Sequence, residues 1–220
     1  MLPVAILVPV LGRPHRVAPT MQSVAAATPS PYRLLFIASR GDRDELAALN
    51  DAGADYVVIG HPGTYARKIN LGARATTEPL LFTAADDLEF HAGWLDAAVA
   101  KLDGTVQVVG TNDLGNPRTI RGEHSTHTLV TRSYLDDPGG VVDGARGQVL
   151  CELYPHDYCD DEFIQTAQSR GVYAHAPDSH VEHLHFLWGK NEIDSTYQLG
   201  MRGHGQGRRI YTRRRHMWAS

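Results

Sequence analysis

The stretch Leu80-Leu-Phe-Thr-Ala-Ala-Asp-Asp-Leu-Glu-Phe90 is an apolar run that stops abruptly at two adjacent carboxylates, Asp86 and Asp87. Its first three residues suit a central parallel strand that is buried on both faces. Carboxylates at the carboxyl end of such a strand lie where open α/β sheets bind ligands. The structural alternative is that one of these acids only caps a helix beginning near His91, because short acids favour helix starts.

Strands and helices alternate on the amino-terminal side of this stretch. Strands are expected at residues 4–10, 33–38 and 55–60, and helices at residues 17–27, 44–52 and 65–76. This alternation predicts a single α/β domain with a mainly parallel, doubly wound sheet. Its ligand edge is expected where the acid pair meets the loops at residues 9–13, 39–42 and 60–64. Neither a Gly-x-Gly-x-x-Gly run after the first strand nor a Walker-type Gly-Lys-Ser/Thr occurs, which argues against dinucleotide redox enzymes and P-loop NTPases.

Charge is distributed unevenly along the 220 residues. Residues 202–220 hold six arginines and no acid, which leaves 15 basic against 25 acidic groups in residues 1–201. We therefore expect an acidic body followed by a basic, Arg-rich tail that either solubilises the protein or reaches the phosphates of a nucleotide or a nucleic acid. The two cysteines form no disulfide framework, and no membrane or export segment is recognised, so a cytoplasmic location is expected.

Two later clusters carry further candidate chemistry. In His180-Val-Glu-His-Leu-His-Phe186, an extended backbone would put His183 and His185 on one face. Imidazoles and paired carboxylates together can bind a divalent cation such as Mg²⁺ or Mn²⁺, although such a run is often purely structural. The acids of Asp157-Tyr-Cys-Asp-Asp-Glu162 precede a predicted helix at residues 160–170, where they either cap the helix or accept a proton from a hydroxyl.

Four segments, in this order and spacing, resemble the family-2 glycosyltransferases of the GT-A fold. They are Val4-Ala-Ile-Leu-Val-Pro-Val10, Lys68-Ile-Asn-Leu-Gly72, Phe82-Thr-Ala-Ala-Asp-Asp87 with Gly93-Trp94 after it, and Cys159-Asp-Asp-Glu-Phe163 with Arg170-Gly171. The resemblance implies a GT-A-like domain over residues 1–201, with a nucleotide-sugar half at 1–110 and an acceptor and catalytic half at 111–201. In the usual Asp-x-Asp motif of the family, this chain has Ala84 in place of the first acid.

The resemblance also implies roles for individual residues. Asp86 would coordinate the metal that holds the nucleotide diphosphate, and His183, with His185 close behind, would add a late ligand. Asp160 falls where the family places its general base. Contacts to the nucleotide-sugar donor would come from Pro9, Arg13, Arg40, Lys68, Asn70 and Asp87.

The resulting hypothesis is a metal-dependent transfer of a sugar from a nucleotide-diphosphate donor to an acceptor hydroxyl, with inversion at the anomeric carbon. The cofactor would be Mn²⁺ or Mg²⁺. A soluble acceptor is expected, namely a saccharide, a small metabolite, a protein side chain or a hydroxylated nucleic-acid base. The alternatives are a sugar nucleotidyltransferase, a metal-dependent hydrolase and a noncatalytic nucleotide-sugar-binding module.

Overall fold

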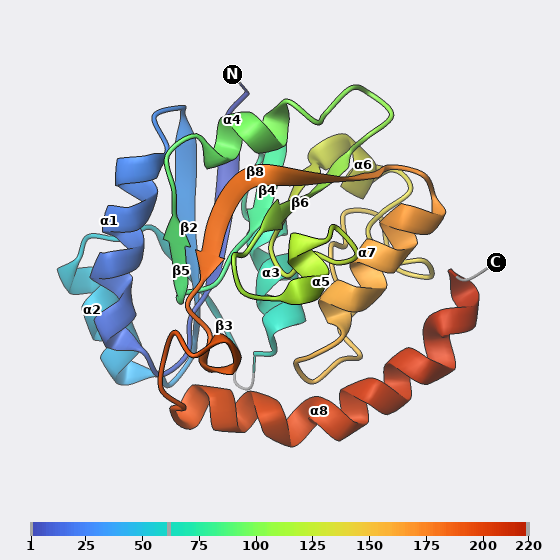
Figure 1. Ribbon diagram of the computed structural model, residues 1–220. Coiled ribbons are helices and arrows are strands. Elements are labelled where there is room, and N and C mark those ends of the chain that lie inside the picture. Colours follow the sequence, from blue (N-terminus) through green and yellow to red (C-terminus); the bar gives the residue numbers. More distant parts are fainter. Residues whose placement is uncertain (1, 61–62, 219–220) are drawn as a thin grey trace.

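The computed structural model describes residues 2–60 and 63–218, which form one sheet with helices packed on both of its faces (Figure 1). The strand order is β3-β2-β1-β4-β7-β6-β8-β5. The strands are β1 (Val4–Pro9), β2 (Tyr32–Ser39), β3 (Tyr56–Ile59), β4 (Leu80–Thr83), β5 (Leu88–Phe90), β6 (Val108–Asn112), β7 (Thr128–Thr131) and β8 (Tyr173–His183). The helices are η1 (Pro14–Arg16), α1 (Val17–Ala27), α2 (Arg43–Asp51), α3 (Tyr65–Arg74), α4 (Trp94–Val99), α5 (Pro117–Ile120), α6 (Arg132–Asp136), α7 (Cys159–Ser169), η2 (Phe186–Trp188), α8 (Ser195–Arg214) and η3 (Arg215–Met217).

The amino-terminal half is parallel, as the alternating pattern predicts. β1 pairs in parallel with both β2 and β4, and β2 pairs in parallel with β3. Beyond β4 the sheet becomes mixed, because β7 is antiparallel to β4 and β6, whereas β6 and β8 are parallel. The predicted α/β domain is therefore confirmed, and the strand that ends at the acid pair lies near the middle of the sheet.

Both faces of β1 are buried, and each faces its own apolar cluster. Val4, Ile6 and Val8 belong to one cluster, and the intervening Ala5 and Leu7 belong to the other. This is the alternation that a strand requires when helices cover both sides of it. The close packing of these layers fixes where the strand ends lie, and with them the polar loops of the ligand edge.

A short strand that the sequence pattern does not reveal brings the late histidines to the acids. β5 has three residues and pairs antiparallel with β8, so that Leu88 lies opposite His183. The strand β8 is long, and it carries the chain from Tyr173, just after α7, to His183 beside the acids. The residue next to Asp87 is thus paired with the histidine proposed as a metal ligand.

The last helix differs from the prediction. Most of the predicted Arg-rich tail is helical, because α8 begins at Ser195, is capped by the Asp194 side chain, and continues to Arg214. Interior glycines disfavour helix by about 1 kcal/mol each. Here packing overrides that preference, because a Cβ on Gly200 would lie 2.8 Å from the His156 ring, and one on Gly207 would lie 2.9 Å from the Asp157 carbonyl oxygen. The final two residues of the predicted tail, 219 and 220, lie outside the described residues.

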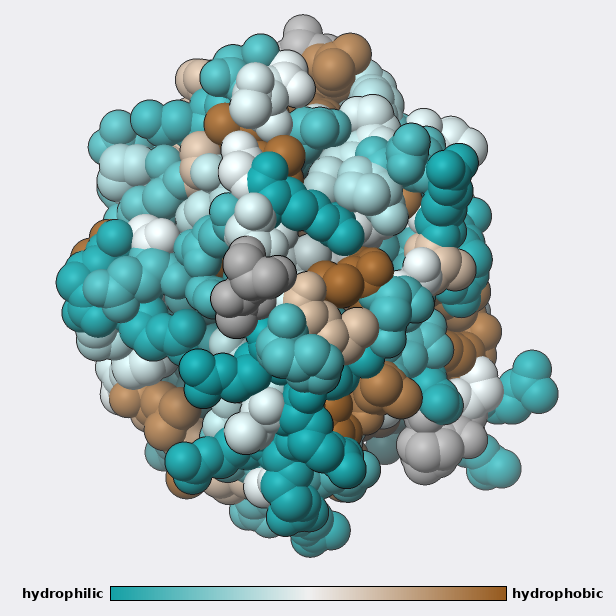
Figure 2. All heavy atoms as spheres, turned by 90° about the vertical axis from the view of Figure 1, so that its right-hand side faces the viewer, coloured by the Kyte–Doolittle hydropathy of each residue, from teal (hydrophilic) through white to brown (hydrophobic). Residues whose placement is uncertain are grey.

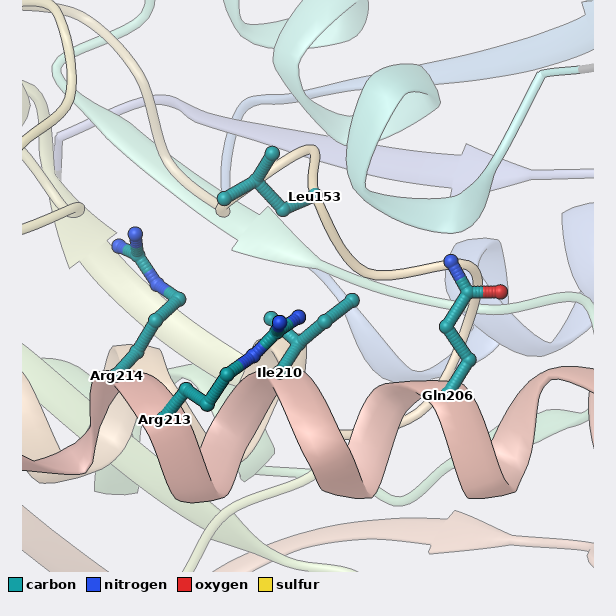
Figure 3. Close-up of a pocket in the computed structure, with 5 residues that line it drawn as sticks. All are labelled: Leu153, Gln206, Ile210, Arg213 and Arg214. Atoms are coloured by element: carbon teal, nitrogen blue, oxygen red, sulfur yellow. The ribbon is translucent and has the colours of Figure 1, made fainter.

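One arginine of this predicted tail is part of a buried charge network. Arg214 donates to Glu162 at 2.7 Å and to Asp143 at 2.6 Å, and Glu162 also accepts from the Tyr154 hydroxyl at 2.7 Å. Figure 3 shows Arg213 and Arg214 on α8, with Leu153 on the facing loop. The side of the molecule on which α8 ends is largely hydrophilic, with only scattered hydrophobic groups (Figure 2). Within the described residues, no helix combines the length and the apolar character needed to cross a bilayer.

We predict that Arg214→Ala lowers the free energy of unfolding by about 3 kcal/mol, because it leaves the buried Glu162 carboxylate without its cation. The neighbouring Arg213→Ala is the matched control, and it should change stability by less than about 0.5 kcal/mol because Arg213 is exposed. Urea denaturation of both variants measures the difference. Equal losses would show that the network around Glu162 contributes no special stability.

Candidate active site

The guanidinium of Arg13, from the loop after β1, lies buried among three acids. Its Nη1 donates to Asp86 Oδ1 at 2.8 Å and lies 3.4 Å from Asp87 Oδ2. Its Nε donates to Asp194 Oδ2 at 2.7 Å, and its centre lies 4.1 Å from the centroid of the Tyr197 ring. The predicted acid pair, the first loop and the start of α8 thus meet at one cation.

The second acid of the pair has more partners than the first. Asp87 accepts a hydrogen bond from the Tyr197 hydroxyl at 2.7 Å, and its Oδ1 lies 3.4 Å from His183 Nε2. The predicted metal set placed Asp86 with His183. In the structure, His183 contacts Asp87, and Asp86 faces Arg13.

These environments move the two carboxyl pKa values apart. Burial, followed by the charge of Asp87, raises the pKa of Asp86 to about 7 despite the opposing effect of Arg13. Burial alone would also raise the pKa of Asp87, but the charge and hydrogen bond of His183, the Tyr197 hydroxyl and Arg13 lower it below its usual range. Asp87 is therefore the firmly ionised member, and Asp86 lies close to its titration point at neutral pH.

Three histidines line the same edge. The ring centroids of His127 and His183 are 4.9 Å apart, as are those of His183 and His185. His127 Nδ1 lies 3.1 Å from the Thr83 carbonyl oxygen, and its buried Nε2 has no hydrogen-bond partner among the described residues. Burial and the charge of His183 lower the pKa of His127 to about 4, so this ring is neutral. His185 Nδ1 accepts a hydrogen bond from the Leu187 backbone at 3.3 Å.

The donor atoms at this edge fit a divalent cation. Asp86 and Asp87 supply buried carboxylate oxygens and His183 supplies an imidazole, a set of hard oxygens with one nitrogen that suits Mn²⁺ and, less well, Mg²⁺. Asp86, with its raised pKa, would be held in its ionised form by a cation. The chemistry of these residues suits the metal that the sequence predicts; in the structure Asp87 and His183 are in contact, whereas Asp86 is paired with Arg13.

Asp160 lies in the first turn of α7, within reach of the same edge. The Tyr65 hydroxyl donates to the Ala84 carbonyl oxygen at 3.2 Å, at the end of β4. Burial, and then the charges of Cys159, Asp160 and Asp87, raise the pKa of Tyr65 well above its usual range. The Tyr65 ring centroid also lies 6.3 Å from that of His156, so Tyr65 contacts both the end of β4 and the segment that leads into α7.

The remaining predicted donor contacts have different surroundings. Lys68 donates from Nζ to the Val10 carbonyl oxygen at 2.5 Å, and burial lowers its pKa to about 8. Asn70 binds the loop at residues 149–152: its amide nitrogen donates to Leu150 and Glu152, and its oxygen accepts from two backbone N–H groups. The structure therefore shows Asn70 as a residue that anchors this loop. Its predicted contact with the donor stays a prediction.

Pro9 and Arg40 end two neighbouring strands at the ligand edge. Pro9 is half-buried at the end of β1, and the exposed Arg40 follows β2, with its backbone N–H bonded to Ile59 at 2.8 Å. Of the predicted loop at residues 60–64, positions 61 and 62 lie outside the described residues. The donor roles of Pro9 and Arg40 likewise stay predictions.

Several residues of the site were not found from the sequence. These are Tyr65, His124, His127, Asp194 and Tyr197. Asp194 carries a local signal, since an aspartate before Ser-Thr-Tyr is a good helix cap. The others have no local pattern, because their partners lie far away in the chain.

Comparisons with known proteins identify the family and the fold of the chain. The model of a family described as Glycosyl transferase family 2 matches residues 5–140. A search of curated proteins found no match. The mannosyltransferase PcManGT of Pyrobaculum calidifontis, solved with GDP-Man and Mn²⁺, superposes with a TM-score of 0.64 at 15% identity, over 83% of this chain and 57% of that one. This chain thus spans little more than half of the mannosyltransferase.

A second similar structure is the glucosyl-3-phosphoglycerate synthase of Mycobacterium tuberculosis, solved with Mn²⁺, UDP-glucose and phosphoglyceric acid. It superposes with a TM-score of 0.63 at 14% identity, over 92% of this chain and 76% of that one. At such low identities these two likenesses establish the fold. They support the predicted GT-A architecture.

Because the pKa values of the two acids shift in opposite directions, removing their charges should affect stability to different extents. In EDTA at pH 7, Asp87→Asn should lower the free energy of unfolding by about 3 kcal/mol, because it removes the buried carboxylate charge that faces both His183 and Arg13. Asp86→Asn should change stability by less than about 1 kcal/mol, since the amide oxygen still accepts from Arg13 and the native carboxyl is partly neutral there.

The pH dependence of stability should also differ between the two variants. The carboxyl of Asp86 has a raised pKa, so native stability should fall as the pH rises through 7, and Asp86→Asn should remove that fall. The charge of Asp87 also raises the pKa of His183, and the stability gained from that pair is lost as the pH rises through the raised value, so the loss in Asp87→Asn should be larger at pH 6 than at pH 8.5. Urea denaturation at these two values measures both effects, and equal losses in the two variants would contradict the assignment.

Proposed function

The chain belongs to glycosyl transferase family 2, and from this membership and the site geometry we propose that it transfers a sugar from a nucleotide-diphosphate donor to an acceptor hydroxyl. The proposed reaction depends on a divalent cation and inverts the anomeric carbon. The observation that supports the proposal is that Tyr65 contacts both the end of β4, where the buried Asp87 lies beside His183, and the segment that leads into α7.

The site offers both signs of charge that a donor diphosphate and its cation need. Asp86, Asp87 and His183 would hold Mn²⁺ or Mg²⁺, which when bound supplies positive charge against the departing diphosphate. Arg13 and Lys68 are buried cations at the same edge and suit phosphate oxygens. The similar structures contain GDP-Man or UDP-glucose with Mn²⁺, which makes nucleotide sugars the class of donor to test first.

Asp160 is proposed as the general base. Its side chain is 25% exposed, so an acceptor can reach it, and its pKa is lowered: burial would raise it, but the hydrogen bond and charge of His124 outweigh that effect. The acceptor O–H bond breaks and its proton passes to Asp160. The acceptor oxygen bonds to the anomeric carbon, and the bond from that carbon to the diphosphate breaks, so that the electron pair leaves with the diphosphate.

We predict that Asp160→Asn reduces sugar transfer at least about a hundredfold while the variant still binds donor, because the amide cannot accept the proton. Asp157→Asn, a change to a neighbouring half-exposed acid that pairs with His204, is the matched control and should keep nearly native transfer. Binding is measured by thermal shift with UDP, GDP and dTDP sugars, with and without Mn²⁺. A ligand at about 100 times its Kd should stabilise the protein by about 2.7 kcal/mol.

The products of the same assay separate the alternatives. Native-like transfer by Asp160→Asn would remove that residue from the role of base. Pyrophosphate as a product would indicate nucleotidyl transfer, and turnover without any acceptor in both proteins would indicate hydrolysis. Donor binding without turnover of any kind would indicate a binding module.

A further inference from the structure

His124 is a buried histidine beside the proposed general base. It lies in the loop between α5 and β7, and only 4% of its side chain is exposed. Gly122, two residues earlier, has φ +75°, and a Cβ there would lie 2.9 Å from the His175 ring. The His124 carbonyl oxygen accepts from the Tyr173 hydroxyl of β8 at 3.3 Å. The loop is thus packed tightly against β8 in a way that holds this imidazole in place.

The ring of His124 faces the first turn of α7. Its Nε2 lies 3.3 Å from Asp160 Oδ2, whereas its Nδ1 lies 3.8 Å from Asp161 Oδ1, too far for a hydrogen bond. Nδ1 is buried and has no hydrogen-bond partner among the described residues. An unpaired buried polar atom costs about 1–3 kcal/mol, so an arrangement that tolerates one calls for an explanation.

All charged groups around the ring favour its protonated form except one. Asp160 and Asp161 approach from α7, and Arg118 approaches from α5, where it donates to Asp161 Oδ1 at 2.9 Å. Burial would lower the pKa of His124, but the hydrogen bond and charge of Asp160 and then the charge of Asp161 raise it above its usual value, against Arg118. In the protonated ring, Nδ1 carries a hydrogen that faces the carboxylate of Asp161.

A divalent cation is the competing interpretation of this cluster. One ligand atom from each of His124, Asp160 and Asp161 lies within 4.8 Å of the others. Two contacts argue against a cation: Asp161 is already paired with Arg118, and His124 Nε2 is already paired with Asp160. A cation here would also occupy the carboxylate that accepts the acceptor proton.

We propose that His124 is a positioning residue for Asp160: it binds Oδ2 of the carboxylate as an imidazolium, holds the group ionised, and leaves the other oxygen to face the acceptor hydroxyl. The inference rests on the proposed function only in treating Asp160 as the base. The pairing itself is a property of the free protein and can be measured without substrate.

The first test is NMR titration of the full chain. In the native protein at pH 7, the ¹⁵N shifts of the His124 ring should be those of an imidazolium, and EDTA or added Mg²⁺, a diamagnetic cation, should not change them. In His124→Gln, which keeps a hydrogen-bond donor but loses the charge, the Asp160 carboxyl ¹³C titration should move up by about one pH unit or more. His175→Gln, a change to the histidine beside the same loop, is the matched control and should leave Asp160 unchanged.

The second test is the pH dependence of sugar transfer. His124→Gln should move the acid limb of kcat to higher pH by the same amount, which lowers the rate about tenfold below that limb and recovers part of it at alkaline pH. A purely structural role would lower the rate at every pH without moving the limb.

Several results would overturn the inference. A neutral His124 ring at pH 7, an Asp160 titration unaffected by His124→Gln, or ring shifts that respond to metal would each do so; the last would indicate a cation site. The native-ring measurement decides the matter even if the variant does not fold. Absence of transfer by the native protein, together with the NMR result predicted, would refute the proposed function and leave the pairing intact.

Discussion

One buried guanidinium connects three distant parts of the chain. Arg13 donates to Asp86 at the end of β4 and to Asp194 at the start of α8, 181 positions away. A charge removed from water is costly unless it is paired, and Asp86, which is as buried as Arg13, would be as costly alone. The loop after β1, the end of β4 and the start of α8 are therefore held together by mutual neutralisation, and the candidate site exists where they meet.

The same interaction explains why two neighbouring acids behave differently. Arg13 is shared among three carboxylates, whereas His183 and the Tyr197 hydroxyl serve Asp87 alone. Asp86 shares Arg13 with two other carboxylates, and burial together with the charge of Asp87 raises its pKa. In the proposed function, a divalent cation adds positive charge at this edge, which makes Asp86 the position most responsive to it.

The sequence predicts the parts of the fold that carry local signals. The run from Leu80 to Asp86 identifies a central strand and its ligand end because burial on both faces leaves a continuous apolar pattern, and the order of motifs alone brings Asp160 to that end. Arg13 and Asp194 could not be paired in this way, since no local pattern records a contact across 181 positions. The three-residue β5 is too short to show a strand period. The helix α8 contains glycines, which disfavour helix, but close packing at Gly200 and Gly207 requires them.

The acids at the start of α7 show how the fold selects one carboxylate from three. Asp160, Asp161 and Glu162 all favour a helix start through the helix dipole, so position along the helix does not distinguish them. Their partners do: Asp161 pairs with Arg118 and is 15% exposed, Glu162 pairs with Arg214 and is 1% exposed, and Asp160 faces His124 and is 25% exposed. Two of the three are paired with arginines. Asp160 faces a histidine instead and is the most accessible of the three, which is why the proposed function assigns the acceptor hydroxyl to it.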